Sequence, residues 1–123
     1  SLEVTQEMIF DGHNGISQMQ DIMQSFRTSP LNSIGGIDII ETSDYLSGEV
    51  VKMSDRSKSS TGLPCSDVIR FRLCNDDVII IRPSGTEPKI KAYYLLSAPD
   101  KQNAQQKLSA YMTDITNFTT VKE

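Results

Sequence analysis

Apolar residues recur at helical spacing near the start of the chain. Between Asn14 and Arg27 they fall on one face of a helical wheel: Ile16, Met19, Ile22, Met23 and Phe26. Such a stripe is typical of an α-helix that packs one side against a core. The sequence Thr-Ser-Pro at residues 28–30 ends this helix, because proline lacks an amide proton and disfavours helical geometry in the residue before it.

A second helical pattern lies near the end of the sequence. It starts after residues 97–100, Ser-Ala-Pro-Asp, where the proline suits an early helical position and Asp100 can accept hydrogen bonds from free amides. Apolar residues then follow at spacings of three and four: Ala104, Leu108, Met112, Ile115 and Phe118. They predict a second amphipathic helix.

Period-two patterns in the second half of the chain predict a hairpin. From residue 69 to residue 73 the apolar side chains point one way, while Arg70 and Arg72 point the other. Asn75 and Asp76 supply turn residues, and the apolar run at 78–82 returns as the second strand. Three consecutive isoleucines in that run favour a central strand.

Two further segments predict strands, and one predicts a loop. Residues 89–96 place four apolar side chains on one face: Ile90, Ala92, Tyr94 and Leu96. Residues 37–45 carry isoleucines and threonine, although their alternation is imperfect. Residues 52–66 are rich in serine and charge, so we expect an exposed loop whose length favours mobility.

The order of these elements predicts the fold class. It runs helix, strand, long loop, hairpin, short loop, strand, helix. This order favours an α+β domain with a mostly antiparallel four-stranded sheet and two helices packed on one face. A chain of 123 residues fits a single domain, and we expect residues 1–123 to form one.

Composition excludes several classes of protein. With 37% hydrophobic and 23% charged residues, the chain resembles a soluble globular protein. No stretch approaches the ~18 apolar residues of a membrane span, and no signal peptide is evident, so we expect a cytoplasmic protein with no membrane partner. Cys65, Cys74 and His13 are too few for a disulfide framework or a zinc site, and we expect buried or idle thiols.

Charge is distributed unevenly along the chain. The net charge is −4, yet residues 52–91 carry eight cations against five acids, whereas residues 1–51 carry one cation against eight acids. The basic segment from Arg56 to Lys91 raises the alternative of a nucleic-acid patch. The negative net charge and the scarcity of aromatic residues there count against a nucleic-acid partner, while a local cationic cluster still suits a small anion.

The loop at residues 82–89, with the sequence RPSGTEPK, has the chemistry of a phosphate clamp. Its two prolines stiffen the backbone, and Gly85 permits a positive φ. The amides of residues 84–86 are expected to converge into a nest for an anion, with hydroxyls from Ser84 and Thr86. Arg82 adds a planar fork of donors and Lys89 a point charge. Glu87 is expected to point away, pairing with a lysine or accepting backbone amides. The alternative is an ordinary turn with solvated charges.

RPSGTEPK, followed by IKAYY, resembles the phosphate-binding signature in the C-terminal domain of the α-D-phosphohexomutases. Further segments resemble the phosphoglucomutase branch: DGHNGISQMQDIMQSFR, IGG at 34–36, DYLSG at 44–48 and TGLPCSDVIRFRL at 61–73. The resemblance implies the fold of that fourth domain, an antiparallel sheet with two helices of the TATA-binding-protein-like type. By position it implies substrate-phosphate contacts from Arg82, Ser84, Gly85 and Thr86, with Lys89 as an addition.

The resemblance also implies what lies elsewhere. Members of the family interconvert sugar 1-phosphates and 6-phosphates by phosphotransfer through a phosphoserine in the first domain, with Mg²⁺ in the second and a sugar-selecting loop in the third. No matching motif appears here, so we expect no catalytic residue and no metal in this chain, which would be inactive alone and partnered by the remaining domains. The segment DGHNG at 11–15 has too few carboxylates for Mg²⁺, and Asp11 is expected at the helix start.

The segment after the loop distinguishes branches of the family. Lys89-Ile90-Lys91 favours the phosphoglucomutase and phosphopentomutase branches over phosphoglucosamine mutase, with glucose phosphate as the expected substrate. A different class is a stand-alone anion-binding or interaction domain without a catalytic parent. A reading frame without upstream phosphoserine and metal motifs would favour that second class.

Overall fold

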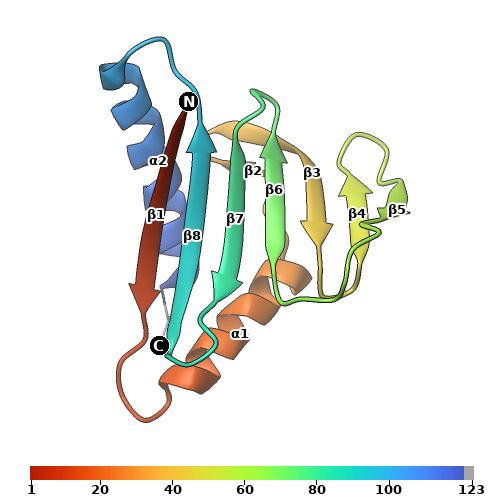
Figure 1. Cartoon of the computed structure of the whole chain (residues 1–123), viewed down its shortest axis with the longest axis vertical. Helices are drawn as coiled ribbons and strands as arrows, with labels where there is room; N and C mark the ends of the chain where they lie inside the picture. Colours follow the sequence, from red (N-terminus) through yellow and green to blue (C-terminus); the bar gives the residue numbers. More distant parts are fainter. Residues whose placement is uncertain (121–123) are drawn as a thin grey trace.

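The computed structural model describes residues 1–120, and these form an open antiparallel sheet with two helices (Figure 1). The elements are β1 Leu2–Ile9, α1 Gly15–Thr28, β2 Ser33–Ile34, β3 Ile37–Asp44, β4 Glu49–Lys52, β5 Lys58–Ser60, β6 Ile69–Leu73, β7 Val78–Pro83, β8 Lys89–Leu96 and α2 Lys101–Thr119. The strand order is β1-β8-β7-β6-β3-β4-β5, and β2 pairs with β3.

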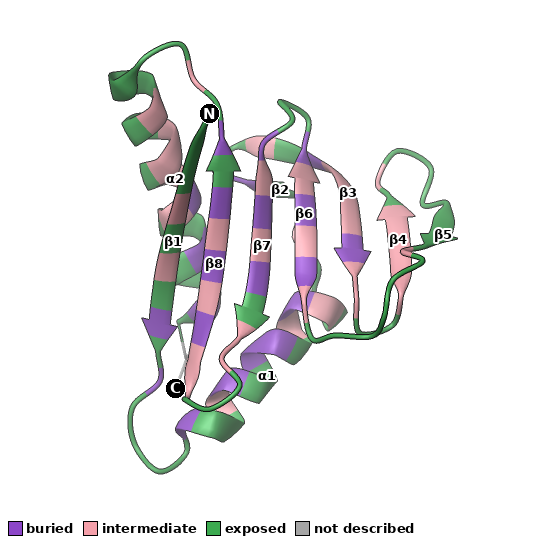
Figure 2. Cartoon of the chain, viewed as in Figure 1, coloured by how far each residue is buried: buried purple, intermediate pink, exposed green. Residues whose placement is uncertain are grey.

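Both helices lie on the same face of the sheet and cover its apolar side (Figures 1 and 2). Along β8 the side chains at 90, 92, 94 and 96 are buried, and those between them are partly exposed or exposed. Phe26 of α1 packs against Phe71 of the sheet and Phe118 of α2, and Tyr94 stacks on Tyr111 of α2. The opposite face of the sheet carries no helix in the described part of the chain.

The predicted class is confirmed: an α+β fold, an antiparallel sheet and two helices on one face. The sheet is larger than the four strands expected, because β1, β2, β4 and β5 join it. The predicted exposed loop at 52–66 contains β5, so that part of the prediction is wrong. β5 is a short, fully exposed strand paired with β4, which explains its loop-like composition.

The imperfect alternation predicted for residues 37–45 has a structural cause. Between Ile39 and Glu41 the register of β3 against β6 shifts by a β-bulge. A bulge inserts an extra residue, so side chains before and after it switch faces relative to a regular strand. Ile39 is therefore buried on the helix side, whereas Glu41 lies opposite Arg72 on the open face.

The two helices match the predicted ranges closely, with three differences. Ile16 is 46% exposed and does not join the buried stripe of α1. Asn14, not Asp11, is the residue that precedes α1, and its side chain makes no capping hydrogen bond. In α2 the fully buried Tyr111 lies at the centre of the packing, although the apolar pattern did not include it. Asp100 caps α2 as predicted, since its carboxylate accepts from the Asn103 amide at 2.8 Å.

Among the described helices, none is long and apolar enough to cross a membrane.

Candidate functional site

The loop between β7 and β8 protrudes from one end of the sheet, close to the start of α1 (Figure 1). Its ends are closed by a hydrogen bond from the Ser84 amide to the Lys89 carbonyl at 2.8 Å, and the Lys89 amide donates to the Glu87 carbonyl at 2.8 Å. Thr86 and Glu87 are exposed, as is Gly85. The loop is thus a closed backbone turn whose tip is open to solvent.

The backbone of the loop differs from the predicted nest in two respects. The Ser84 amide is used to close the turn and does not converge with its neighbours on an anion. Gly85 does not have a positive φ. The glycine has another consequence: a Cβ built at this position would meet no atom within 4 Å, so the space above the backbone is empty. Without a side chain there, a ligand can approach the peptide closely.

The Ser84 hydroxyl organises the tip of the loop. Its oxygen accepts from the Thr86 amide at 3.4 Å and from the Glu87 amide at 3.3 Å. Both contacts are at the long end of the hydrogen-bond range, so these two amides are weakly engaged. No hydrogen bond among residues 1–120 uses the Gly85 amide. An anion at the tip would compete only with the Ser84 hydroxyl for the Thr86 and Glu87 amides, and with no described acceptor for the Gly85 amide.

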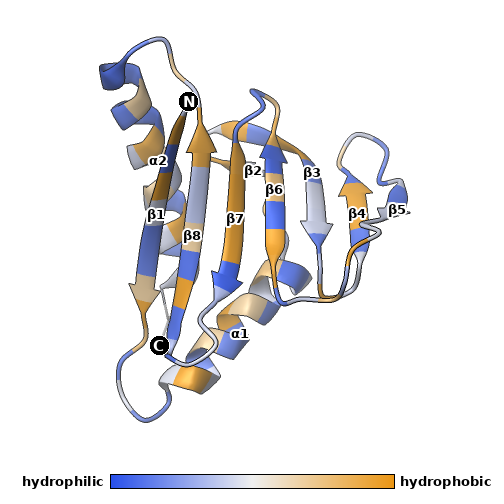
Figure 3. Cartoon of the chain, viewed as in Figure 1, coloured by the Kyte–Doolittle hydropathy of each residue, from blue (hydrophilic) through white to orange (hydrophobic). Residues whose placement is uncertain are grey.

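Two cations lie side by side at the base of the loop. Arg82 is the second-last residue of β7 and is exposed, and its cross-strand neighbour on β8 is Lys91. β7 is hydrophobic along most of its length and turns hydrophilic at this end (Figure 3). Neither cation forms an ion pair with any described residue. Like charges directly opposite each other in a sheet are unfavourable, so an anion bound between Arg82 and Lys91 would relieve their repulsion.

Lys91 was not among the phosphate contacts predicted from the sequence. It lies two residues beyond Lys89 on the same face of β8, and the antiparallel register with β7 places it beside Arg82. The alternation of β8 indicated the shared face, but the pairing of residue 91 with residue 82 depends on the length and shape of the connecting turn.

Lys89 forms ion pairs with two carboxylates of the same chain. Its Nζ lies 3.2 Å from Glu7 Oε1 and 3.7 Å from Glu87 Oε1, and its side chain is 16% exposed. The hydrogen bond with Glu7 is the main cause that raises the pKa of Lys89 above its ordinary value. The expectation that Glu87 pairs with a lysine is therefore confirmed, whereas the sequence analysis did not foresee Glu7 as a partner of Lys89.

The start of α1 supports the far side of the loop. The Phe10 amide donates to the Pro88 carbonyl at 2.8 Å. Gly15 lies against the proline ring: a Cβ at residue 15 would come within 2.9 Å of Pro88 Cβ and 2.3 Å of the Phe10 carbonyl oxygen. A side chain at this position would displace the backbone on one or both sides. The segment DGHNG thus contacts the loop, while His13 within it is exposed.

A second polar cluster lies at the opposite end of β7. Asp77 is 3% exposed, and its carboxylate accepts from the Tyr111 hydroxyl at 2.7 Å, from the Ser97 amide at 3.1 Å and from Lys107 Nζ at 2.9 Å. The Asn75 side chain donates to the same carboxylate and to the Tyr111 oxygen. Burial is the main cause that raises the pKa of Tyr111 above its ordinary value. Every polar atom of this cluster is partnered, so it serves the fold.

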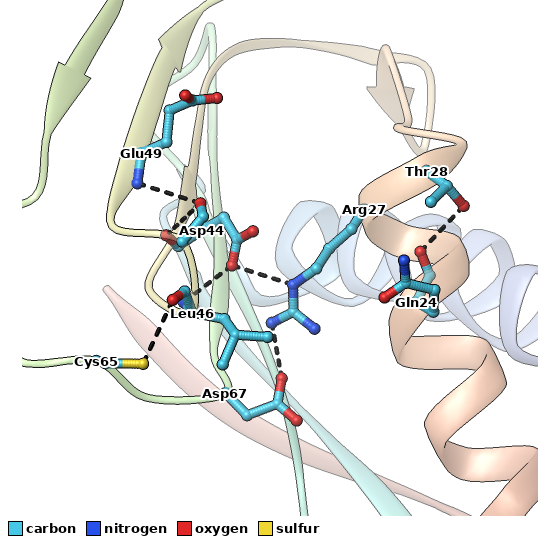
Figure 4. A network of polar contacts seen from close by, with 9 residues as sticks. Gln24, Arg27, Thr28, Asp44, Leu46, Glu49, Cys65 and Asp67 are labelled. Carbon is cyan, nitrogen blue, oxygen red and sulfur yellow. Dashed lines mark hydrogen bonds and ion pairs between the residues drawn. The ribbon is translucent and has the colours of Figure 1, made fainter.

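A third cluster joins α1 to the far half of the sheet (Figure 4). Arg27 Nε lies 3.0 Å from Asp44 Oδ1, and Arg27 Nη2 lies 2.7 Å from Asp67 Oδ1. Asp44 Oδ1 also accepts from the Leu46 amide at 3.0 Å. A cleft of about 160 Å³ adjoins this cluster. Because two carboxylates already hold the guanidinium, Arg27 is not available to an anionic ligand.

Residues 1–120 contain no group of three histidine, cysteine, aspartate or glutamate side chains placed to hold a metal ion. Cys65 and Cys74 are both free thiols and exposed, so the buried alternative of the expected buried or idle thiols is wrong. The Cys65 thiol donates to the Leu46 carbonyl at 3.3 Å.

No protein-family model matches the chain. Curated phosphoglucomutases do match it. The phosphoglucomutase of Staphylococcus aureus strain MRSA252 is 39% identical over 100 residues, which cover 81% of this chain and 18% of that protein. The phosphoglucomutase of Staphylococcus saprophyticus strain ATCC 15305 is 36% identical over 107 residues, or 86% of this chain and 19% of its own length. The resemblance to the phosphoglucomutases is confirmed, and the chain spans about a fifth of the relatives it matches.

Proposed function

The chain is related to about a fifth of the length of the phosphoglucomutases, and from this premise we propose that it is the substrate-phosphate-binding domain of a larger phosphohexomutase. The parent enzyme is an isomerase that interconverts hexose 1-phosphate and hexose 6-phosphate through a phosphoserine. This domain is its C-terminal one. Its part is to hold the phosphate that is not reacting, and by itself it is inactive.

The observation that carries the proposal is the unpaired Arg82 beside Lys91 at the base of an open loop. A phosphate dianion placed there meets two positive charges and compensates their mutual repulsion. The guanidinium of Arg82 offers two parallel N–H donors that match two phosphate oxygens, and Lys91 adds a point charge. If both cations were already in ion pairs within the chain, a bound phosphate would gain less.

The tip of the loop completes the clamp. Gly85 and Thr86 are exposed residues, and no described residue accepts from the Gly85 amide. The missing side chain at residue 85 lets an oxygen approach the peptide. Ser84 orients the Thr86 amide and offers its own hydroxyl hydrogen. Each hydrogen bond to a charged group contributes about 1.5 to 3 kcal/mol, so a few of them suffice for specific capture.

The groups that recognise the ligand are directed at a phosphate and not at a sugar. A clamp of this kind accepts either end of a hexose bisphosphate, which an intramolecular phosphotransfer requires because the two phosphates exchange roles. Holding one end fixed lowers the entropic cost of aligning the other with the phosphoserine. The phosphoserine, the Mg²⁺ and the choice of sugar belong to the other domains of the proposed enzyme.

The experiment is an amide chemical-shift titration of the ¹⁵N-labelled chain. Inorganic phosphate and glucose 1-phosphate should both shift the amides of residues 82–91, with weak affinity because the other domains are absent. Glucose at the same concentration should shift none of them, and chloride at matched ionic strength serves as the salt control. Shifts confined to residues 52–66, or equal responses to phosphate and chloride, would contradict the proposal.

A further inference from the structure

The exit of the loop is attached to a strand far away in sequence. Lys89 is the first residue of β8, and its Nζ reaches Glu7 Oε1 on β1 at 3.2 Å, across 82 residues of sequence. The two residues are not direct cross-strand neighbours: Glu7 pairs with Lys91 in the register, and Lys89 pairs with Ile9. The lysine therefore leans diagonally along the open face of the sheet, toward Glu7.

The same exit is held at two further points, both from the segment that follows β1. The Phe10 amide donates to the Pro88 carbonyl, and Gly15 packs against the Pro88 ring. With the Lys89 ion pair, three contacts of different kinds fix residues 88 and 89 on the N-terminal segment. The Arg82 side chain, at the entry of the loop, forms no hydrogen bond or ion pair among residues 1–120.

Lys89 and Lys91 are thus distinguished by their partners. Lys89 has two carboxylates within 3.7 Å and is 16% exposed, and Lys91 forms no ion pair with any residue that the structure describes. A phosphate that recruited Lys89 would have to compete with Glu7 and would bring a third anion close to Glu7 and Glu87. Lys91 also has Glu7 as its cross-strand neighbour on β1, but recruiting Lys91 breaks no ion pair that the described residues form.

We infer that Lys89 and Glu7 form a positioning pair that fixes the exit of the phosphate loop on β1, and that Lys89 is not itself a phosphate ligand. The inference rests on the proposed function and revises the role that the sequence gave to Lys89. Glu7 acts on the ligand through Lys89 and the backbone of residues 88 and 89. The same ion pair fixes Lys89, the first residue of β8. It thereby helps to set the strand register that places Lys91, two residues further on, beside Arg82.

The test is a charge swap read by two measurements. The first measurement is the set of amide shifts of residues 84–88 in the free protein. The second is the dissociation constant for inorganic phosphate, from the titration described above. Lys89→Glu alone should move the loop amides and weaken phosphate binding at least tenfold, since it places a third carboxylate beside Glu7 and Glu87. Adding Glu7→Lys should restore the wild-type loop shifts and bring affinity back to within about threefold.

Neutral variants provide the matched comparison. Lys89→Met should weaken phosphate binding about two- to fivefold, the range expected for losing one exposed ion pair, and should shift the amides of residues 84–88 in the free protein. Lys91→Met should leave those free-protein shifts in place and weaken binding at least as much. The pattern in which Lys89→Met abolishes binding without moving the loop would identify Lys89 as a direct ligand and overturn the inference.

Failure of the proposed function gives a different result from failure of this inference. If the wild-type chain binds no phosphate, the proposed function fails, and the free-protein shifts still report on the positioning pair. If phosphate binds but the double variant Glu7→Lys/Lys89→Glu stays as weak as Lys89→Glu alone, the positioning pair is wrong and the clamp stands. Unmoved loop amides in Lys89→Met would also contradict the inference.

Discussion

The two ends of β7 carry charges in opposite situations. Asp77, just before the strand, is 3% exposed and has its carboxylate partnered by Tyr111, Lys107, Asn75 and the Ser97 amide. Arg82, near the other end, is exposed and forms no ion pair among residues 1–120. A buried charge without partners is costly, so a satisfied one indicates a role in the fold. An exposed cation beside a second cation indicates a role outside the chain.

The largest effect is expected at Asp77. Asp77→Ala leaves Lys107 and Tyr111 without their buried acceptor, and losing one partner of a buried ion pair costs about 3 to 5 kcal/mol. Urea denaturation should show a loss of this size in the free energy of unfolding. Asp21→Ala, an exposed acid on α1, is the control and should change it by less than about 0.5 kcal/mol. Similar losses in the free energy of unfolding for Asp77→Ala and Asp21→Ala would contradict the structural role of Asp77.

Arg82→Ala should show the reverse pattern. Phosphate affinity should fall at least tenfold, since each hydrogen bond to a charged group contributes about 1.5 to 3 kcal/mol. The free energy of unfolding should stay within about 0.5 kcal/mol of wild type, because Arg82 is exposed and its side chain forms no hydrogen bond or ion pair with a described residue. Arg72→Ala is the matched control on the same face of the sheet: Arg72 already pairs with Glu41 and Asp76, so phosphate affinity should be unchanged. A destabilised Arg82→Ala would assign Arg82 to the fold.

Lys91→Met tests the second cation at the loop end of β7. Phosphate affinity should fall about fivefold, since a unit charge at ~4 Å contributes about 1 kcal/mol in water. Thermal unfolding should occur at the same temperature or slightly above it, because the like-charged neighbour of Arg82 is gone. Lys107→Met, the matched lysine at the other end, should be clearly less stable, since Asp77 then loses its cation. If Lys91→Met were the less stable of the two, Lys91 would have a structural partner.

The smallest effect concerns alkaline pH. Burial raises the pKa of Tyr111 and of Tyr94 above the ordinary value of 10.0. The folded state keeps both phenols protonated where the unfolded state releases the protons, so the stability they contribute is full below pH 10 and falls as pH rises above it. Urea midpoints measured from pH 9 to pH 11 should decline, and Tyr111→Phe should reduce the decline. A urea midpoint that did not change with pH would contradict the raised pKa of these two phenols.

The strongest predictions from the sequence were the elements with a clear internal period. The two helices, the hairpin at 69–82 and the strand at 89–96 were readable because burial on one face imposes a local spacing on the residues themselves. The loop was readable because prolines, a glycine, hydroxyls and cations concentrate in eight residues. The residues of the clamp stay a prediction, and their presence at one end of the sheet agrees with it.

The tertiary structure decided the rest. β1 buries a single residue, and β5 buries none, so neither carries a pattern that identifies a strand; each exists through its pairing with β8 or β4. Lys89 is paired and Lys91 is unpaired among the described residues because Glu7 binds Lys89. Glu7 is remote from both lysines in sequence but lies on the adjacent strand. Which cations are free is set by long-range pairing, and a local period carries no information about long-range partners.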